Sequence, residues 1–358
     1  MDFLLIFSLF LPLIFLLWLA NLADKRRMQE RPRRDVAVLV HTLLALYWLA
    51  LFGAGAFLLL LGVAYQRYAD VSLLAESYRQ QGLDPTVVVE MMRAFPKMGS
   101  GFILLAVMGL LTLLSPFRRL LARLLPISAN SVVHLVAINY SILILVNMWL
   151  VMGMGLETML DMMKESSNTT TGDMIHLLWA QDIALALMAF VGVGWLSRRR
   201  WSEAMRRLGL VWPSWKEAGV GFGLGLAMFA LLFPASYLLE KLGLGMDPNI
   251  EQLTEELLGP LLTTLPGIFT LGVAAALGEE LVYRGALQPR FGIVMTALLF
   301  ALTHNQYGLS AATLVVFALG LVLGWVRERY NTSTAMILHA TYNIAIGLTG
   351  LIAGRMLH

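Results

Sequence analysis

Long apolar runs alternate with short polar segments along most of this chain. Ten of these runs are long enough, or nearly long enough, to cross a bilayer, which takes about 20 helical residues. Their approximate spans are 3–22, 36–64, 99–115, 131–155, 176–196, 217–239, 261–283, 291–304, 311–326 and 333–353. The runs are continuously apolar and do not alternate as barrel strands do, so they predict helices, which satisfy their own backbone hydrogen bonds in lipid. We therefore expect an all-α, polytopic transmembrane bundle of about ten helices.

The composition fits a protein whose solvent is the bilayer. Hydrophobic residues make up 58% of the 358 positions and charged residues only 14%, whereas soluble domains average about 25% charged residues. The absence of cysteine excludes disulfides, thiolate metal ligands and a cysteine nucleophile. The net charge of +3 does not indicate nucleic-acid binding, because basic residues in membrane proteins usually mark cytoplasmic loops.

The distribution of basic residues predicts the orientation in the membrane. If the N-terminus lies outside, the inside loops contain 19 of the 26 Lys and Arg residues, as the positive-inside rule requires. These loops are 23–35, 116–130, 197–216, 284–290 and 327–332. The first apolar run has basic residues after it and none before it, which is the reverse of a cleaved signal peptide. We expect a retained first helix and both termini outside, in the cytoplasmic membrane of a bacterium.

Three segments of the chain differ in character. Residues 1–196 contain about five apolar helices without obvious chemistry, and their role is not indicated. Residues 197–216 are rich in Arg and Trp and resemble an amphipathic cytoplasmic linker. Residues 217–358 contain glycines at the small-xxx-small spacing of closely packed membrane helices. The pairs are Gly219/Gly223, Gly221/Gly225, Gly320/Gly324 and Gly350/Gly354.

The last segment also carries ionisable residues within apolar runs. Each costs about 2.5–3.5 kcal/mol on insertion scales, so it suggests a functional site. Glu280 and Arg284 are four residues apart, share a helix face and can form an ion pair. Glu279 points about 100° away and has no partner at helical spacing. The simpler interpretation is a helix end at the membrane surface that carries three ordinary charges.

Two further motifs place histidines in membrane helices. His304 ends the eighth run, and His339 and Asn343 lie four residues apart on one face of the tenth. Taken singly, such residues are usually structural or form interhelical hydrogen bonds. Taken with the carboxylates, they suggest a hydrolase: a carboxylate can take a proton from water, and a histidine can orient that water. The other histidine and the amide can donate hydrogen bonds to an oxyanion.

The motifs Glu279-Glu280-x-x-x-Arg284, Phe300-x-x-x-His304 and His339-x-x-x-Asn343 resemble those of the CAAX-protease and bacteriocin-processing family. These proteins, also called Abi proteins, include the eukaryotic Ras-converting endopeptidase. Phe317–Gly324 is similar to the small-residue helix that the family places between its histidine motifs, and the resemblance covers about 217–353. Two features depart from the family: the stretch between Arg284 and His304 is a few residues short, and residues 1–200 have no counterpart in the minimal core.

The resemblance implies an intramembrane glutamate-type endopeptidase with no cofactor and no metal. Its implied substrate is a peptide or protein at the membrane, cleaved near a CAAX-like C-terminus or elsewhere, and no nucleic acid is involved. Glu279 would be the catalytic carboxylate, and His304 would help it to activate water. His339 and Asn343 would stabilise the oxyanion, with Glu280 and Arg284 as structural or electrostatic supports. Helical rise places His304 about 20 Å from the inner surface, so its helix must tilt or begin inside the membrane to meet Glu279.

Two other functions fit the same residues. A zinc protease could use Glu279, His304 and His339 as ligands, although no His-Glu-x-x-His motif places two ligands on one helix turn. Alternatively, the chain is a non-catalytic membrane protein: a scaffold, an immunity factor, or a transporter whose buried charges form a proton path.

Overall fold

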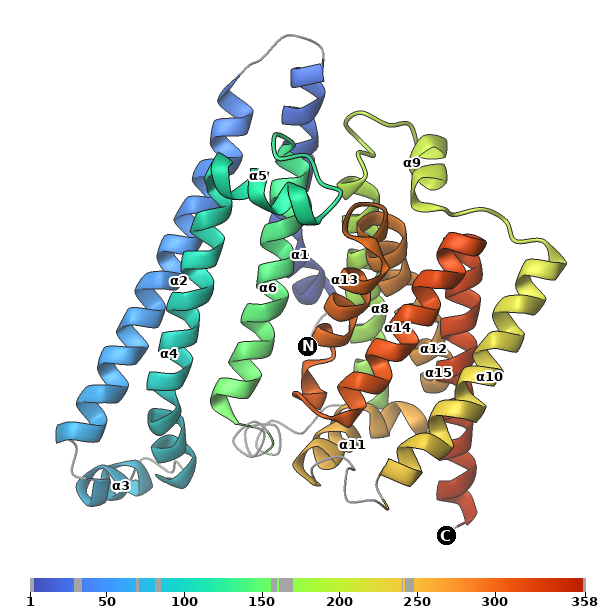
Figure 1. The fold of residues 1–358 in the computed structure, drawn as a ribbon. Coiled ribbons are helices and arrows are strands. Elements are labelled where there is room, and N and C mark those ends of the chain that lie inside the picture. Colours follow the sequence, from blue (N-terminus) through green and yellow to red (C-terminus); the bar gives the residue numbers. More distant parts are fainter. Residues whose placement is uncertain are drawn as a thin grey trace.

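The computed structural model describes residues 3–28, 34–68, 71–80, 85–155, 160, 170–239, 241 and 248–356. These residues are almost entirely helical, and the only bridge recorded among them is the isolated pair Trp195–Arg199. The prediction of an all-α bundle is therefore confirmed (Figure 1). In chain order the helices are α1 Phe3–Met28, α2 Arg34–Tyr68, α3 Val71–Gln80, α4 Pro85–Leu113, α5 Ser115–Leu124, α6 Val132–Met154, α8 Thr171–Gly192, α9 Trp201–Leu208, α10 Trp215–Leu239, α11 Pro248–Leu262, α12 Leu265–Glu280, η2 Leu281–Leu287, α13 Gln288–Thr303, η3 Asn305–Tyr307, α14 Ala311–Arg329 and α15 Thr332–Met356.

Within the described residues, nine helical stretches are long and apolar enough to cross a membrane. The count differs from the ten predicted runs because the seventh and eighth runs join in one stretch of 39 residues, Leu265–Thr303. As a straight helix this stretch would be about 58 Å long, roughly twice the hydrocarbon thickness. It is instead interrupted at Gly292, whose φ of 76° and ψ of 170° are readily accessible only to glycine. The break lies within α13, so the stretch has one leg before Gly292, which includes α12 and η2, and a shorter one after it.

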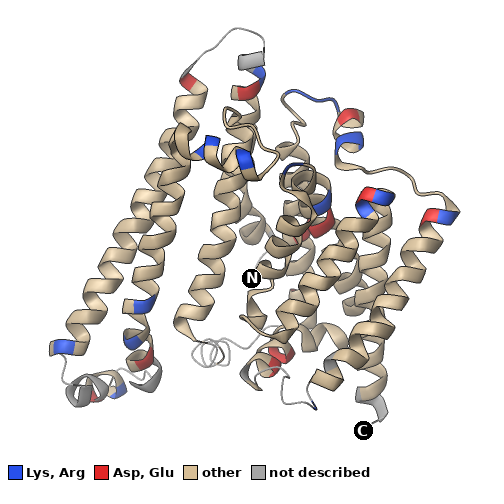
Figure 2. Cartoon of the chain, in the orientation of Figure 1, with Lys and Arg blue, Asp and Glu red and all other residues tan. Residues whose placement is uncertain are grey.

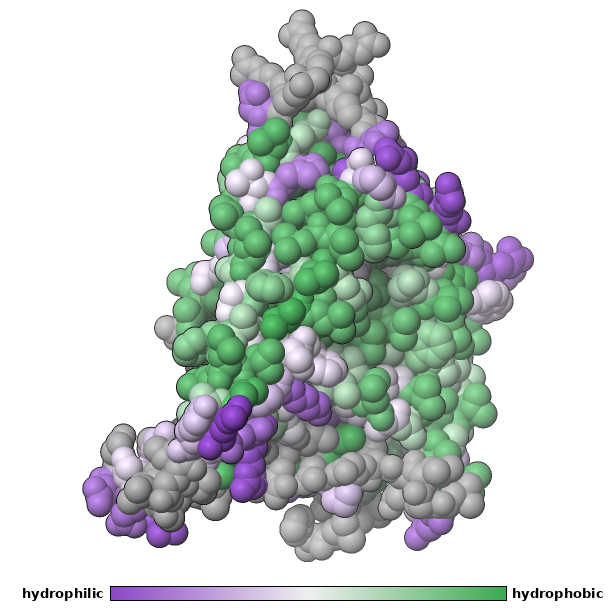
Figure 3. Space-filling model, turned by 60° about the vertical axis from the view of Figure 1, so that its left-hand side comes forward, coloured by the Kyte–Doolittle hydropathy of each residue, from purple (hydrophilic) through white to green (hydrophobic). Residues whose placement is uncertain are grey.

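The outer surface of the bundle is strongly apolar. Figure 3 shows hydrophobic residues covering most of the side of the molecule, with hydrophilic residues towards its two ends. Large side chains such as Leu60 and Phe57 are mostly exposed, at 70% and 64%. Soluble monomers rarely expose continuous apolar areas of this kind. The chain is an integral, multi-pass membrane protein.

Some of the predicted glycine pairs lie at helix contacts and others do not. α10 packs along α15, and a Cβ atom added at Gly221 or Gly225 would lie 2.8 or 2.7 Å from a carbonyl oxygen of α15. Gly219 and Gly223 have nothing within 4 Å of the same position. The close approach of α10 to α15 therefore depends on the pair Gly221/Gly225, as small-residue packing in membranes requires.

α8 connects the N-terminal helices to the C-terminal group. It packs against α1 on one side and against α12 and η2 on the other. The side-chain amide of Asn21 in α1 donates hydrogen bonds of 3.0 Å to the carbonyl oxygens of Val191 and Gly192 at the end of α8. The division of the chain at residues 196 and 216 stays a prediction, but a helix from the first segment clearly reaches the segment with the candidate chemistry.

Charged residues lie mainly near the two ends of the helices, and the middle of the bundle is nearly free of them (Figure 2). α5 and α9, which belong to two of the predicted inside loops, lie at the same end of the molecule (Figure 1). This arrangement agrees with the prediction that these two loops lie on one side of the membrane.

The orientation can be tested with reporter fusions. We expect fusions within residues 200–215 to report a cytoplasmic location, because this loop is rich in Arg. Fusions within 160–172, most of which lies outside the described residues, should report an external one. A cytoplasmic signal from 160–172 would contradict the predicted topology.

Candidate active site

The two adjacent carboxylates lie at the junction between α12 and a π turn. Glu279 and Glu280 are the last residues of α12, and Arg284 lies in η2, which follows without a break. A π turn inserts an extra residue into a helix, changes the direction of the side chains that follow, and often marks a functional site. The end of α12 thus has a local geometry that regular helical spacing does not describe.

Glu280 and Arg284 form a buried ion pair, as their spacing predicted. Nε of Arg284 lies 3.2 Å from Oε2 of Glu280, and neither side chain is exposed. The guanidinium carbon also lies 4.4 Å from the ring centre of Phe300, in a cation–π contact. Buried charges need partners that replace water. The carboxylate and the aromatic ring lie beside the guanidinium, whose three nitrogens have no hydrogen-bond partner among the described residues.

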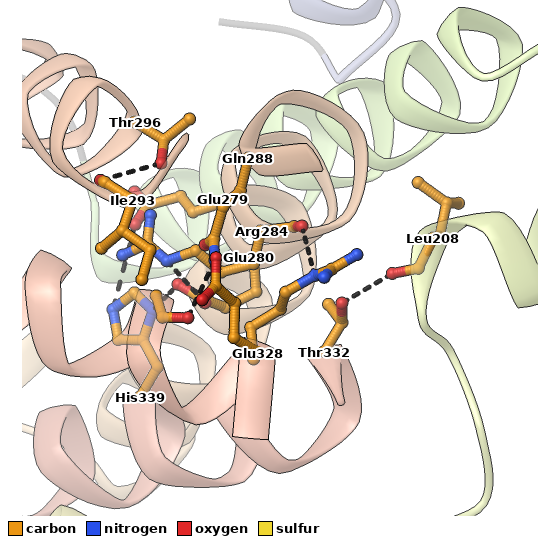
Figure 4. Close-up of polar contacts among 12 residues, drawn as sticks. Leu208, Glu279, Glu280, Arg284, Gln288, Ile293, Thr296, Glu328, Thr332 and His339 are labelled. Carbon is orange, nitrogen blue, oxygen red and sulfur yellow. Dashed lines mark hydrogen bonds and ion pairs between the residues drawn. The ribbon is translucent and has the colours of Figure 1, made fainter. Parts of the chain in front are cut away.

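His339 of α15 lies between the two glutamates (Figure 4). Its Nδ1 is 3.1 Å from Oε1 of Glu280, and its Nε2 is 3.9 Å from Oε2 of Glu279. The first distance is a hydrogen bond, whereas the second is too long for one. His339 therefore connects the fully buried Glu280 with Glu279, whose side chain remains 19% exposed.

The surroundings of His339 determine which ring nitrogen carries the proton of the neutral imidazole. A carboxylate paired with Arg284 can only accept a hydrogen bond, so Nδ1 of His339 donates to Glu280. The lone pair of Nε2 then faces Glu279. A histidine held in this way by a buried carboxylate presents a basic nitrogen in a fixed orientation.

His304 lies beyond the ring of Phe300. The Phe300 ring makes edge contacts with both histidines, at 5.0 Å from His304 and 5.8 Å from His339 between ring centres. Nδ1 of His304 lies 2.9 Å from the carbonyl oxygen of Phe300, and its ring stacks on Tyr307. Because a carbonyl only accepts, Nδ1 is again the donor and Nε2 is free in the neutral ring. The break at Gly292 divides α13, the helix that ends next to His304.

Asn343 lies farther along α15 than His339. Its Nδ2 donates a hydrogen bond of 3.3 Å to the carbonyl oxygen of Leu271, which lies two turns before Glu279 in α12. The amide nitrogen carries a second hydrogen that remains available to another acceptor. The structure thus places Glu279, Glu280, Arg284 and His339 together, with His304 across the Phe300 ring and Asn343 one turn away along α15.

Further hydrogen bonds join the helices around η2 to one another. Nε2 of Gln288 donates to the carbonyl oxygen of Gly324 at 2.8 Å and to Glu328 at 3.3 Å, which connects the start of α13 to α14. The hydroxyl of Thr332 donates to the carbonyl oxygen of Leu208 at 2.6 Å (Figure 4). The segment 197–216 therefore packs against the site region through α9.

Arg207 extends this contact between α9 and η2. Its Nη1 donates to the carbonyl oxygen of Gly285 at 3.0 Å, one residue after Arg284. Burial, followed by the nearby positive charge of Arg290, lowers the pKa of Arg207 to about 10. The side chain therefore remains charged at neutral pH and can support its hydrogen bond.

Two residues near the site were not identified from the sequence. Gln288 is buried at 3% exposure directly after η2, and Asp182 of α8 is buried at 1% exposure beside α12. Gln288 gives no signal in the sequence because a single amide at a helix end is common. Asp182 does give one, since it is an acidic residue within the apolar run 176–196.

Removing one partner of the ion pair should destabilise the protein strongly, because the other charge is then left buried without a partner. We expect Arg284→Met to reduce the free energy of unfolding by about 3–5 kcal/mol, because it leaves Glu280 charged and buried without its cation. Thermal melting of the purified protein in detergent measures the effect.

The double variant Glu280→Gln/Arg284→Met is the matched control. It removes both charges, so it should melt at a higher temperature than Arg284→Met alone. If the two substitutions simply add in their destabilising effects, the two side chains are not coupled as described.

Comparison with known proteins places this site within a matched segment. A comparison with curated protein sequences found no match, and neither did a comparison with solved structures. Residues 261–345, which include Glu279, Glu280, Arg284, His304, His339 and Asn343, match the family model described as type II CAAX prenyl endopeptidase Rce1-like. The resemblance drawn from the motifs is thus confirmed for this segment, which is similar to the Rce1-like CAAX endopeptidases.

Proposed function

We propose that this protein is an intramembrane endopeptidase in which Glu279 and His339 activate a water molecule, with His339 in the role that the resemblance implied for His304. The observation that supports this most directly is the position of His339 between two glutamates of unequal surroundings. Glu280 is paired with Arg284 and accepts the Nδ1 proton of His339. Glu279 and the Nε2 lone pair of His339 are then two acceptors 3.9 Å apart.

A water molecule beside these two acceptors would have a defined orientation. At hydrogen-bond distances of about 2.8 Å it can donate one hydrogen to each acceptor. Its oxygen lone pairs would then point away from both, towards a substrate carbonyl. Positioning of this kind is a large part of general-base catalysis.

The hydrolysis that follows balances in atoms and protons. The water oxygen forms a bond to the carbonyl carbon, one water proton passes to Glu279, and the carbonyl oxygen becomes an oxyanion. The carbon–nitrogen bond then breaks, and Glu279 returns the proton to the leaving nitrogen. In this proposal the second Nδ2 hydrogen of Asn343 stabilises the oxyanion. His304 lies at the edge of the same site, where its Nε2 can accept a hydrogen bond.

The same comparison supports a proposal for the substrate class. The matched family is named for the prenyl endopeptidase activity of type II CAAX enzymes, so we propose a membrane-associated peptide or protein, cleaved near its C-terminus. Whether a prenyl group is required can be measured with matched peptides, with and without the lipid, in bilayer nanodiscs. Comparing membrane proteomes of cells that express the wild type or Glu279→Ala would identify the natural substrates through their uncleaved termini.

The catalytic assignment predicts different results for the two glutamates. We expect Glu279→Gln to lower turnover by about 10²–10⁴ without changing the melting temperature, because it removes only the general base. Glu280→Gln serves as the control at the adjacent position, and it should lower the melting temperature as well as activity. If Glu279→Gln stays active while Glu280→Gln is stable and inactive, the roles of the two carboxylates are reversed.

Asn343→Ala tests the oxyanion role. We expect kcat to fall by about 10²–10³ while KM changes little, because the hydrogen bond strengthens only in the transition state. An increase in KM at constant kcat would mean that Asn343 binds the substrate and does not stabilise the oxyanion.

The zinc protease is the second enzymatic possibility, since the free Nε2 atoms of both histidines resemble those of metal ligands. Over the described part of the chain, however, no three His, Asp or Glu side chains are grouped so that they could hold a metal ion. Loss of activity in a strong chelator, restored by zinc, would favour this alternative. If the wild type, Glu279→Gln and Glu280→Gln cleave no membrane peptide at all, the non-catalytic function takes precedence.

A further inference from the structure

Asp182 is an ionisable residue in the membrane interior for which the endopeptidase mechanism has no role so far. It lies in the middle of α8, outside the segment that matches the family model, and only 1% of it is exposed. An acidic side chain at this depth is costly unless it has a partner. The groups that contact Asp182 therefore bear directly on its role.

Asp182 packs directly on the backbone of α12 next to Glu279. A Cβ atom added at Gly278 would lie 2.8 Å from the Cα atom of Asp182 and would overlap its Oδ1. Three residues before Asp182, the indole nitrogen of Trp179 donates to the hydroxyl of Thr270 at 3.2 Å, which sets the register of α8 against α12. Asp182 is also close enough to Glu279 for the two carboxyl groups to interact electrostatically.

Each of the two carboxyl groups has one buried oxygen without a hydrogen-bond partner. These atoms are Oδ1 of Asp182 and Oε2 of Glu279. A buried polar atom without a partner costs about 1–3 kcal/mol, and more when it is charged. Two carboxylates that share a site also avoid carrying two negative charges. A single proton held between the two groups satisfies both requirements.

We propose that Asp182 is a positioning residue of the active site, whose carboxyl group shares one proton with Glu279. The shared O–H group occupies one lone pair of Oε2 of Glu279 and fixes its direction, and the other lone pair of this oxygen, 3.9 Å from Nε2 of His339, remains free to accept a proton from water. No proton is consumed in this role, because the shared proton stays between the two groups throughout the cycle. The inference rests on the proposed catalytic role of Glu279, and it extends the active site to a helix of the N-terminal segment.

Substitution of Asp182 separates positioning from packing. Asp182→Asn can still donate a hydrogen bond to Glu279, so we expect it to keep kcat within about tenfold of the wild type. Asp182→Ala leaves Glu279 free to turn away, and a misplaced catalytic group costs about 10² in rate. We expect that loss in kcat, with KM unchanged and no decrease in melting temperature, because a buried ionisable group has been removed.

Asp173→Asn is the matched control, because it makes the same chemical change in the first turn of α8, where Asp173 belongs to an exposed capping box. It should leave kcat unchanged. A wild-type kcat in Asp182→Ala would overturn the proposal. A fall in activity that is fully explained by the fraction of unfolded Asp182→Ala protein would also overturn it. Equal inactivity of Asp182→Asn and Asp182→Ala, with both folded, would also overturn it.

A second measurement does not depend on enzyme activity. Infrared difference spectra of the wild type against Asp182→Asn, recorded in nanodiscs at neutral pH, should show the carbonyl stretch of one protonated carboxyl group. The difference spectrum of Asp173→Asn should lack this band. If the band is present and no peptide is cleaved, the proposed function fails and the shared proton stands. If the wild type cleaves peptides and the band is absent, the inference about Asp182 fails alone.

Discussion

The buried contact among Glu280, Arg284 and His339 is the constraint on which the rest of this site depends. The two charges lie in a part of the protein that water does not reach, and each would be strongly unfavourable without the other. The pair can form only if α12 continues into η2 in the correct direction. The hydrogen bond between His339 and Glu280 also requires α15 to cross α12 at the level of Glu280. A local electrostatic requirement thus determines how three elements are arranged.

Small residues make this arrangement possible. A Cβ atom at Gly272 of α12 would lie 3.1 Å from the carbonyl oxygen of Ala340, next to His339 in α15. On the opposite side of α12, Gly278 gives the same close access to α8. Because α12 can be approached so closely from both sides, side chains of α8 and α15 reach the two glutamates at its end. Dispersion forces and polar contacts, not hydrophobic burial, hold helices together in lipid, so such close approach also stabilises the bundle.

The sequence predicted those parts of the structure that depend on local periodicity. The apolar runs predicted the helices, and the four-residue spacing of Glu280 and Arg284 predicted their ion pair. The break at Gly292 was missed because one glycine in an apolar run has no distinctive pattern. The bridging position of His339 was also missed, because it depends on the level at which α15 crosses α12. Asp182 lies 97 positions before Glu279, so only the packing of α8 on α12 brings them together.

The two adjacent glutamates show how a fold makes chemically different groups from identical side chains. Successive residues of a helix point in directions about 100° apart, so only one of the pair can face Arg284. Glu280 takes that position, loses all contact with solvent and spends its two oxygens on Arg284 and His339. Glu279 is left with partial exposure, a basic nitrogen 3.9 Å away and a buried oxygen that no cation neutralises. A carboxylate whose charge is already compensated is a poor base, whereas one that lacks a cation and can reach water is a good one. The ion pair therefore does more than stabilise the bundle: by occupying one glutamate, it assigns the reactive position to the other.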